Sequence, residues 1–138
     1  MIWKKKIAID DINNSMKNTM ASFLDINVIE VGENYIKANM PVNNKTIQPF
    51  GILHGGASVV LAETIGSLAS NLILNDNYYS VGLDINANHI KAVRNNYVVG
   101  TAVPLHLGKS THVWEIKIMQ EKKLTCISRL TTAILEKK

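Results

Sequence analysis

The sequence predicts an α+β fold in which an antiparallel β-sheet wraps around one long central helix. Residues 57–74 form a continuous apolar segment whose side chains point in nearly every direction of a helix, so we expect this helix to be buried almost all round. Six shorter segments around it have the residue types and alternation of strands. One such helix and one sheet can cover each other only if the sheet curves around the helix.

Three elements are expected before the long helix. Residues 9–21 predict a short, weakly amphipathic helix. Residues 26–31 and 35–42 predict two strands, and the turn residues 32–34 between them are typical of a hairpin. The chain therefore begins with a helix and a pair of antiparallel strands.

Four strands are expected after the long helix, over residues 79–91, 97–107, 111–120 and 124–135. In the third of these, large apolar residues alternate with smaller or charged ones, as in a strand with one buried face: Trp114, Ile116 and Ile118 against Val113, Glu115 and Lys117. The connections are short and polar. Short connections predict that successive strands are antiparallel neighbours.

Length and composition place limits on the kind of protein. A chain of 138 residues with 46% hydrophobic residues predicts a single domain over residues 1–138. The net charge of +4 comes from dispersed basic residues, so we expect no nucleic-acid partner. We also expect no membrane association, because no apolar segment reaches the length of a membrane span. The single Cys126 cannot form an internal disulfide, which favours a cytoplasmic protein.

Residues 47–58 are the most informative segment for function. A Pro-Gly turn, His54 and the pair Gly55-Gly56 lead directly into the long helix. Free N–H groups at such a helix start, together with the helix dipole, can bind an anion or a developing oxyanion. Glu63, two turns later, is the single acidic residue of this helix, and burying a lone carboxylate is costly. Glycine pairs and helical glutamates also have ordinary structural uses, but their combination here indicates acyl chemistry.

Two other kinds of catalytic site are not expected. The four histidines lack the spacing of metal ligands, and no carboxylate cluster accompanies them, so we expect no metal. A serine hydrolase is not expected either, since the chain contains no Gly-x-Ser-x-Gly motif.

Several segments along the whole chain resemble one enzyme family. They are Met1-Ile2-Trp3-Lys4, Gln48-Pro49-Phe50-Gly51, Leu53-His54-Gly55-Gly56-Ala57-Ser58, Val81-Gly82-Leu83-Asp84-Ile85-Asn86-Ala87-Asn88-His89, Pro104-Leu105-His106-Leu107-Gly108 and Ser128-Arg129-Leu130-Thr131-Thr132. The chain is similar to the small bacterial acyl-CoA thioesterases of the 4-hydroxybenzoyl-CoA thioesterase type, which have the hotdog fold. The resemblance implies hydrolysis of an acyl-CoA to free acid and CoA, with CoA as part of the substrate and no separate cofactor.

The resemblance also implies roles for individual residues. Glu63 matches the family's catalytic carboxylate, which acts as a nucleophile or as a general base for water. The amide of Gly55 matches the oxyanion donor. Gln48 and His54 match side chains that hold and polarise the thioester, and Ser67 matches a polar residue near the attacking group. The substrate arm is expected along two segments: Gly82, His89, Ile90, Lys91 and Ala92 in one, and His106, Leu107, Gly108, Lys109, Ser110 and Thr111 in the other.

Substrate and assembly are implied in less detail. An aromatic acyl group is expected, with 1,4-dihydroxy-2-naphthoyl-CoA of menaquinone biosynthesis as the leading candidate. Two alternatives stay open: a proofreading thioesterase that clears aryl groups from an acyl or aryl carrier protein, and a non-catalytic acyl-CoA-binding protein. Gly55 and Glu63 lie about 12 Å apart along one helix, too far to act on one carbonyl, so we expect a homodimer or homotetramer with the active site at the dimer interface.

Overall fold

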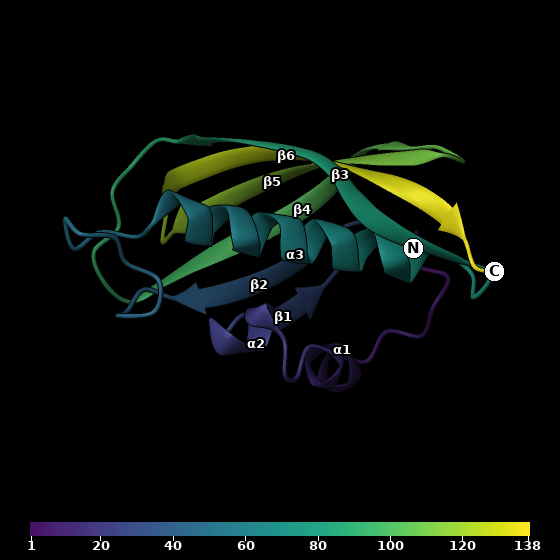
Figure 1. Ribbon diagram of the computed structural model, residues 1–138, viewed down its shortest axis with the longest axis horizontal. Helices are drawn as coiled ribbons and strands as arrows, with labels where there is room; N and C mark the ends of the chain where they lie inside the picture. The colour runs from purple at the N-terminus through teal and green to yellow at the C-terminus, as the bar shows by residue number, and fades with distance from the viewer.

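The computed structural model describes all residues 1–138 and contains one antiparallel six-stranded sheet packed against the long helix α3 (Gly55–Ile73) (Figure 1). The strands lie in the order β1-β2-β4-β5-β6-β3. Their bounds are β1 (Asn27–Val31), β2 (Ile36–Pro41), β3 (Tyr78–His89), β4 (Tyr97–Leu107), β5 (Thr111–Gln120) and β6 (Lys123–Glu136). The predicted fold, an antiparallel sheet curving around one long helix, is confirmed.

The core lies between α3 and the concave face of the sheet. Alternate residues of β5 face α3, and the side chains of Trp114, Ile116 and Ile118 are fully buried there. They pack in one cluster with Leu61 and Ile65 of α3, which are also fully buried. Burial of each such side chain contributes about 1.5–3 kcal/mol to folding, so this interface fixes the position of the helix on the sheet.

Only one side of α3 is buried deeply. The other side, which includes Val60, Glu63 and Ser67, is half-buried, so the expectation of a helix buried almost all round is wrong for a single chain. The reason is that the sheet covers the helix from one side only (Figure 1). By its length and mean hydropathy (1.3), α3 could span a membrane, contrary to the expectation from the sequence. However, 56% of its apolar segment is buried in the fold, so the helix is apolar because it belongs to the core.

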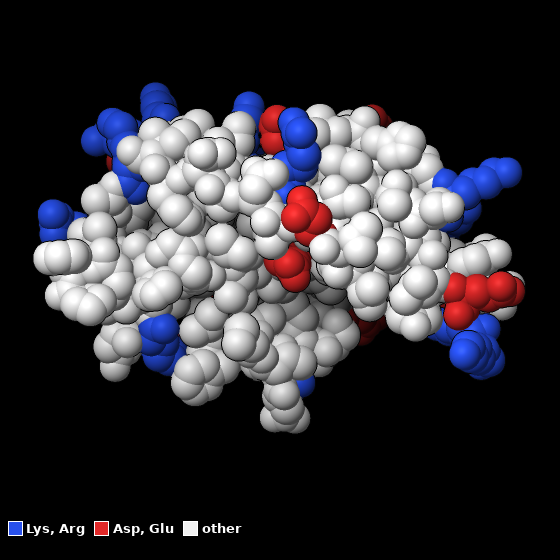
Figure 2. Space-filling model, turned by 45° about the horizontal axis from the view of Figure 1, so that its top comes forward, with Lys and Arg blue, Asp and Glu red and all other residues white.

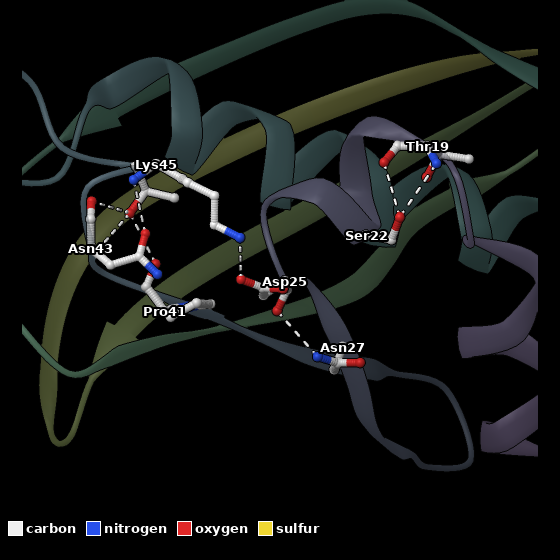
Figure 3. A network of polar contacts seen from close by, with 8 residues as sticks. Thr19, Ser22, Asp25, Asn27, Pro41, Asn43 and Lys45 are labelled. Atoms are coloured by element: carbon white, nitrogen blue, oxygen red, sulfur yellow. Dashed lines mark hydrogen bonds and ion pairs between the residues drawn. The ribbon is translucent and has the colours of Figure 1, made fainter.

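The N-terminal region contains two short helices where one was predicted. They are α1 (Ile9–Ser15) and α2 (Met20–Phe23), and Asn18 between them has a left-handed φ of 61° that ends the helical path. Figure 3 shows how the α2 region is held: Lys45 forms an ion pair with Asp25 at 2.5 Å. The chain after α2 is thereby tied to the loop that follows β2.

The connection between β3 and β4 differs from the prediction. The sequence predicts that residues 94–96 form a turn between two neighbouring strands, now β3 and β4. In the structure β3 pairs with β6 alone, and β4 lies between β2 and β5. Residues 90–96 pass around the N-terminal end of α3 (Figure 1), where the Leu53 amide donates to the Val93 carbonyl oxygen at 2.7 Å. Strand β3 is therefore an edge strand, and one of its sides has no partner strand.

Candidate active site

A cavity of about 350 Å³, here called the N-terminal cavity, lies where α3 begins. Its walls come from three parts of the chain: the loop before α3, the first turn of α3, and the end of β3 with the residues that follow it. The polar groups in its lining belong to Gln48, Gly55, Ser58, His89, Lys91 and Thr125.

The first turn of α3 leaves one backbone donor free. His54 is the N-cap residue, and its Nδ1 accepts the Gly56 amide at 2.8 Å. The amides of Ala57 and Ser58 donate to the His54 carbonyl oxygen. The Gly55 amide donates to no group of the chain, so it is available to a bound oxyanion at the positive end of the helix dipole.

Backbone amides orient the side chains of Gln48 and His54. The Gln48 Oε1 accepts the Phe50 amide, which leaves the Nε2 group as a free donor beside the N-terminal cavity. The neutral His54 ring that accepts at Nδ1 carries its proton on Nε2, which is a second free donor. Gln48 and His54 together line a shallow depression that includes Phe50 and Gly55.

Gly55 lies in close contact with His89 at the end of β3. A Cβ atom on Gly55 would lie 2.7 Å from the His89 Nε2, a distance that real side chains do not adopt. Glycine at this position therefore lets the imidazole ring approach the start of α3. Two segments far apart in the sequence therefore meet at the start of α3.

Glu63 lies in a different cavity, also of about 350 Å³, here called the Glu63 cavity. Its lining residues come from α2 and from the half-buried side of α3: Met20, Ala21, Val59, Val60, Glu63, Thr64 and Ser67. The Glu63 carboxylate is half-buried, and no hydrogen bond or ion pair from the chain reaches it. The carboxylate is therefore free to interact with a group from outside the chain.

The carboxylate of Glu63 points toward the edge strand β3. A Cβ atom on Gly82 would lie 2.9 Å from the Glu63 Oε2. The lack of a side chain at Gly82 therefore leaves space for the carboxylate, so Glu63 lies directly against the face of β3. Four apolar side chains are exposed on this strand: Tyr78, Tyr79, Val81 and Leu83.

A third cavity, of about 360 Å³, lies at the opposite end of α3 and is here called the C-terminal cavity. Its lining includes Lys4, Tyr78, Leu107, Gly108, Lys109 and His112. Residues 107–109 of the second segment predicted to bind substrate line this cavity, whereas His106, Ser110 and Thr111 do not. Within one chain it is separated from the N-terminal cavity by the length of α3, 19 residues or about 28 Å.

His112 belongs to a buried polar cluster below the C-terminal cavity. Its Nδ1 lies 3.1 Å from the Ser70 Oγ, which also accepts the Trp114 Nε1–H group at 2.7 Å and lies 3.0 Å from the Thr132 Oγ1. Burial lowers the pKa of His112 below its ordinary value of 6.5, and the neighbouring charge of His106 lowers it further. The ring is therefore neutral at physiological pH.

The distribution of charge on the surface is uneven. Figure 2 shows one face that is mostly uncharged, with a few acidic groups near its middle and basic groups toward its periphery. No group of three or more His, Cys, Asp or Glu side chains is placed to hold a metal ion. The lone Cys126 is buried, and burial raises the pKa of its thiol.

The structure brings the predicted site residues together in three groups. Gln48 and Gly55 lie with residues 89–92, Glu63 lies with Ser67 and near Gly82, and residues 107–109 lie at the far end. Residues 90–92 follow β3, and 108–110 form the turn before β5, so neither predicted segment is wholly strand.

Sequence reasoning did not predict several lining residues of the N-terminal and Glu63 cavities, among them the polar Ser58, Thr64 and Thr125 and the apolar Met20. Helical spacing could have identified Ser58, which lies one turn after Gly55. No sequence signal connects Met20 to Glu63.

Comparisons with known proteins identify the family and fold of the chain. A profile of the Thioesterase superfamily matches residues 50–127. The 1,4-dihydroxy-2-naphthoyl-CoA hydrolase of Escherichia coli is 52% identical over 136 residues, which cover 98% of this chain and 100% of that protein. The crystal structure of a thioesterase from Haemophilus influenzae has a TM-score of 0.96 at 48% identity, covering 99% of this chain and 96% of that one.

A second solved structure has the same fold. A glutamine-to-alanine variant of a thioesterase from Pseudomonas aeruginosa superposes with a TM-score of 0.98 at 42% identity, covering 99% of this chain and 100% of that chain. The fold is therefore the hotdog fold implied by the sequence. The chain belongs to the Thioesterase superfamily and is a thioester hydrolase.

Proposed function

We propose that this protein hydrolyses an aromatic acyl-CoA, with 1,4-dihydroxy-2-naphthoyl-CoA as the leading substrate, to the free acid and CoA. The main observation in support is the pairing of two unsatisfied groups on one helix: the free amide of Gly55 and the partnerless carboxylate of Glu63. The relative from E. coli, whose match covers 98% of this chain, carries the name of this activity. CoA is part of the substrate, and no further cofactor is needed.

The reaction follows from the chemistry of these groups. The Gly55 amide donates a hydrogen bond to the thioester carbonyl oxygen, and this bond strengthens as the oxygen becomes negative. The free Nε2 groups of Gln48 and His54 hold the same end of the thioester. Glu63 either attacks the carbonyl carbon or removes a proton from the attacking water. The C–S bond breaks, and the thiolate of CoA leaves.

One chain does not supply both groups to the same carbonyl. Gly55 and Glu63 are separated by eight residues of helix, about 12 Å, and they line different cavities. A two-fold dimer resolves this, because antiparallel copies of α3 place Gly55 of one chain opposite Glu63 of the other. The edge strand β3, with exposed Val81 and Leu83, supplies the surface for such pairing.

The same dimer accounts for the two separated substrate-binding segments. Antiparallel pairing of β3 with its copy places the His89 end of one chain near the Tyr78 end of the other. Residues 89–92 of one chain then lie on the same side as residues 106–111 of its partner. The exposed cations Lys91 and Lys109 are suited to the phosphates of CoA. The assembly is a homodimer, or a homotetramer made of two such dimers.

A panel of thioesters tests the proposal. We expect the purified protein to release thiol fastest from 1,4-dihydroxy-2-naphthoyl-CoA and other aromatic acyl-CoA substrates, and more slowly from straight-chain ones. An arylated carrier protein belongs in the same panel, because faster release from it would indicate a proofreading thioesterase. Binding of acyl-CoA without thiol release would contradict catalysis and favour an acyl-CoA-binding protein.

A further inference from the structure

Ser58 of α3 is the one buried serine that has no hydrogen-bond partner for its hydroxyl group. Its residue surface is 3% exposed. The other buried serines are all bonded: Ser70 to the cluster around His112, Ser80 to Asn71 at 2.9 Å, and Ser128 to the Asn86 carbonyl oxygen at 2.8 Å. The Ser58 hydroxyl is therefore free to bond to a group from outside the chain.

The hydroxyl of Ser58 faces the N-terminal cavity. Ser58 lines this cavity. Every side-chain oxygen or nitrogen atom that is closed off from solvent has a hydrogen-bond partner, so a side-chain oxygen without a partner is open to solvent. The Ser58 oxygen is therefore open to the cavity. Ser58 follows Gly55 by three residues, so it lies on the same side of α3 one turn later, and helical side chains lean toward the N-terminus of their helix.

The polar groups that surround this hydroxyl define the kind of ligand it can bind. The Gly55 amide and the Gln48 Nε2 group are free donors beside the same cavity, and neither has an acceptor in the chain. The rest of the wall combines apolar side chains, among them Ile52, Leu53 and Ile90, with the polar side chains of His89, Lys91 and Thr125. Several donors beside one cavity suit an acceptor such as a carbonyl oxygen, which can take on negative charge during reaction.

We propose that the Ser58 hydroxyl is a further catalytic group that donates a hydrogen bond to the carbonyl oxygen of the bound thioester, beside the Gly55 amide. The proposal rests on the proposed thioesterase function and adds a substrate-contacting residue to it. The hydrogen bond strengthens as the carbonyl oxygen becomes an oxyanion, so it lowers the barrier more than it improves binding. No proton leaves Ser58 in this step.

Replacement of Ser58 by alanine tests this role, with Ser128→Ala as the matched control, since both side chains are 3% exposed. We expect Ser58→Ala to lower kcat about tenfold to a hundredfold with KM within about twofold of wild type. Its Tm should be equal to or above that of wild type, because no partner in the protein loses a bond. Ser128→Ala removes the bond to Asn86, so it should lower Tm and leave kcat unchanged.

Three outcomes distinguish the possibilities. A wild-type kcat in Ser58→Ala would overturn the role, with the hydroxyl bound to an ordered water only. A fall in both kcat and Tm of Ser58→Ala would also overturn the role, because the residue would then be structural. Ser58→Cys keeps the size of the side chain and a weak donor, so we expect it to give an intermediate kcat with an unchanged Tm. A wild-type protein without activity on any thioester would contradict the proposed function itself.

Discussion

A Cβ atom on Gly82 of β3 would lie 2.9 Å from the Oε2 of Glu63 on α3. This relationship joins the edge of the sheet to the carboxylate that we propose as catalytic. The carboxylate has no partner within the chain, and β3, which it contacts, is an edge strand. In the dimer that we propose, a second copy of the chain covers both.

Gly82→Ala should impair catalysis without unfolding the protein. The added methyl group would occupy the space next to the carboxylate and push Glu63 from its position. We expect kcat to fall at least about tenfold while Tm changes by only a few degrees. Asn86→Ala, on the same strand with an exposed side chain, is the control and should keep wild-type kcat. Equal kcat values for Gly82→Ala and wild type would show that Glu63 does not act from this position.

Glu63→Gln should abolish turnover while leaving binding and stability intact. The amide keeps the shape of the side chain but can neither attack the thioester nor accept a proton from water. We expect kcat to fall at least about a thousandfold, or roughly 4 kcal/mol of barrier. Binding of a non-hydrolysable acyl-CoA analogue, measured by calorimetry, should be unchanged. Retention of more than about a tenth of wild-type kcat would exclude the catalytic role.

The alternation of Trp114, Ile116 and Ile118 and the apolar segment of α3 were enough to predict the architecture. The pairing of β3 with β6 could not be predicted, because such non-local pairing depends on which strands the packed helix brings together. The break at Asn18 had only the weak signal that asparagine tolerates left-handed φ.

The candidate site was predictable where one motif supplies several groups. His54 and Gly55 stand together in the sequence, and their local geometry follows from the helix start. Ser58 was missed because a serine in a helix usually has an ordinary packing or surface role, and its burial without a partner is visible only in three dimensions. Met20 was missed because α2 reaches the Glu63 cavity through tertiary packing alone.

Loss of the charge at Lys91 or Lys109 should weaken substrate binding more than catalysis. Both side chains are exposed and lie by the cavities at the two ends of β3, so we expect them to hold the phosphates of CoA in the ground state and the transition state alike. Lys91→Ala and Lys109→Ala should each raise KM about threefold to tenfold with little change in kcat, and less so at high salt. Lys122→Ala, in the turn before β6, is the control. Equal kinetics on CoA and pantetheine thioesters would remove this role.

Stability should decrease in mild acid because of His112. Its pKa in the folded protein lies below the ordinary value of 6.5, mainly through burial. As the pH falls below that value, the unfolded chain takes up a proton that the folded protein resists, so the free energy of unfolding decreases. His112→Gln removes the titrating group and can still bond to Ser70. The loss of Tm between about pH 7.5 and 5.5 should therefore be smaller in this variant than in wild type; an equal loss would show that His112 is not responsible.

The central claim is that Gly55 of one chain and Glu63 of its partner act on the same thioester. It is tested most directly by mixing and refolding two inactive variants, Glu63→Ala and Gly55→Val, and measuring thiol release by the verified heterodimer. Each heterodimer would contain one intact site and one doubly defective site, so a statistical mixture should recover about a quarter of wild-type activity. No recovery, despite verified heterodimers, would contradict a site shared between two chains.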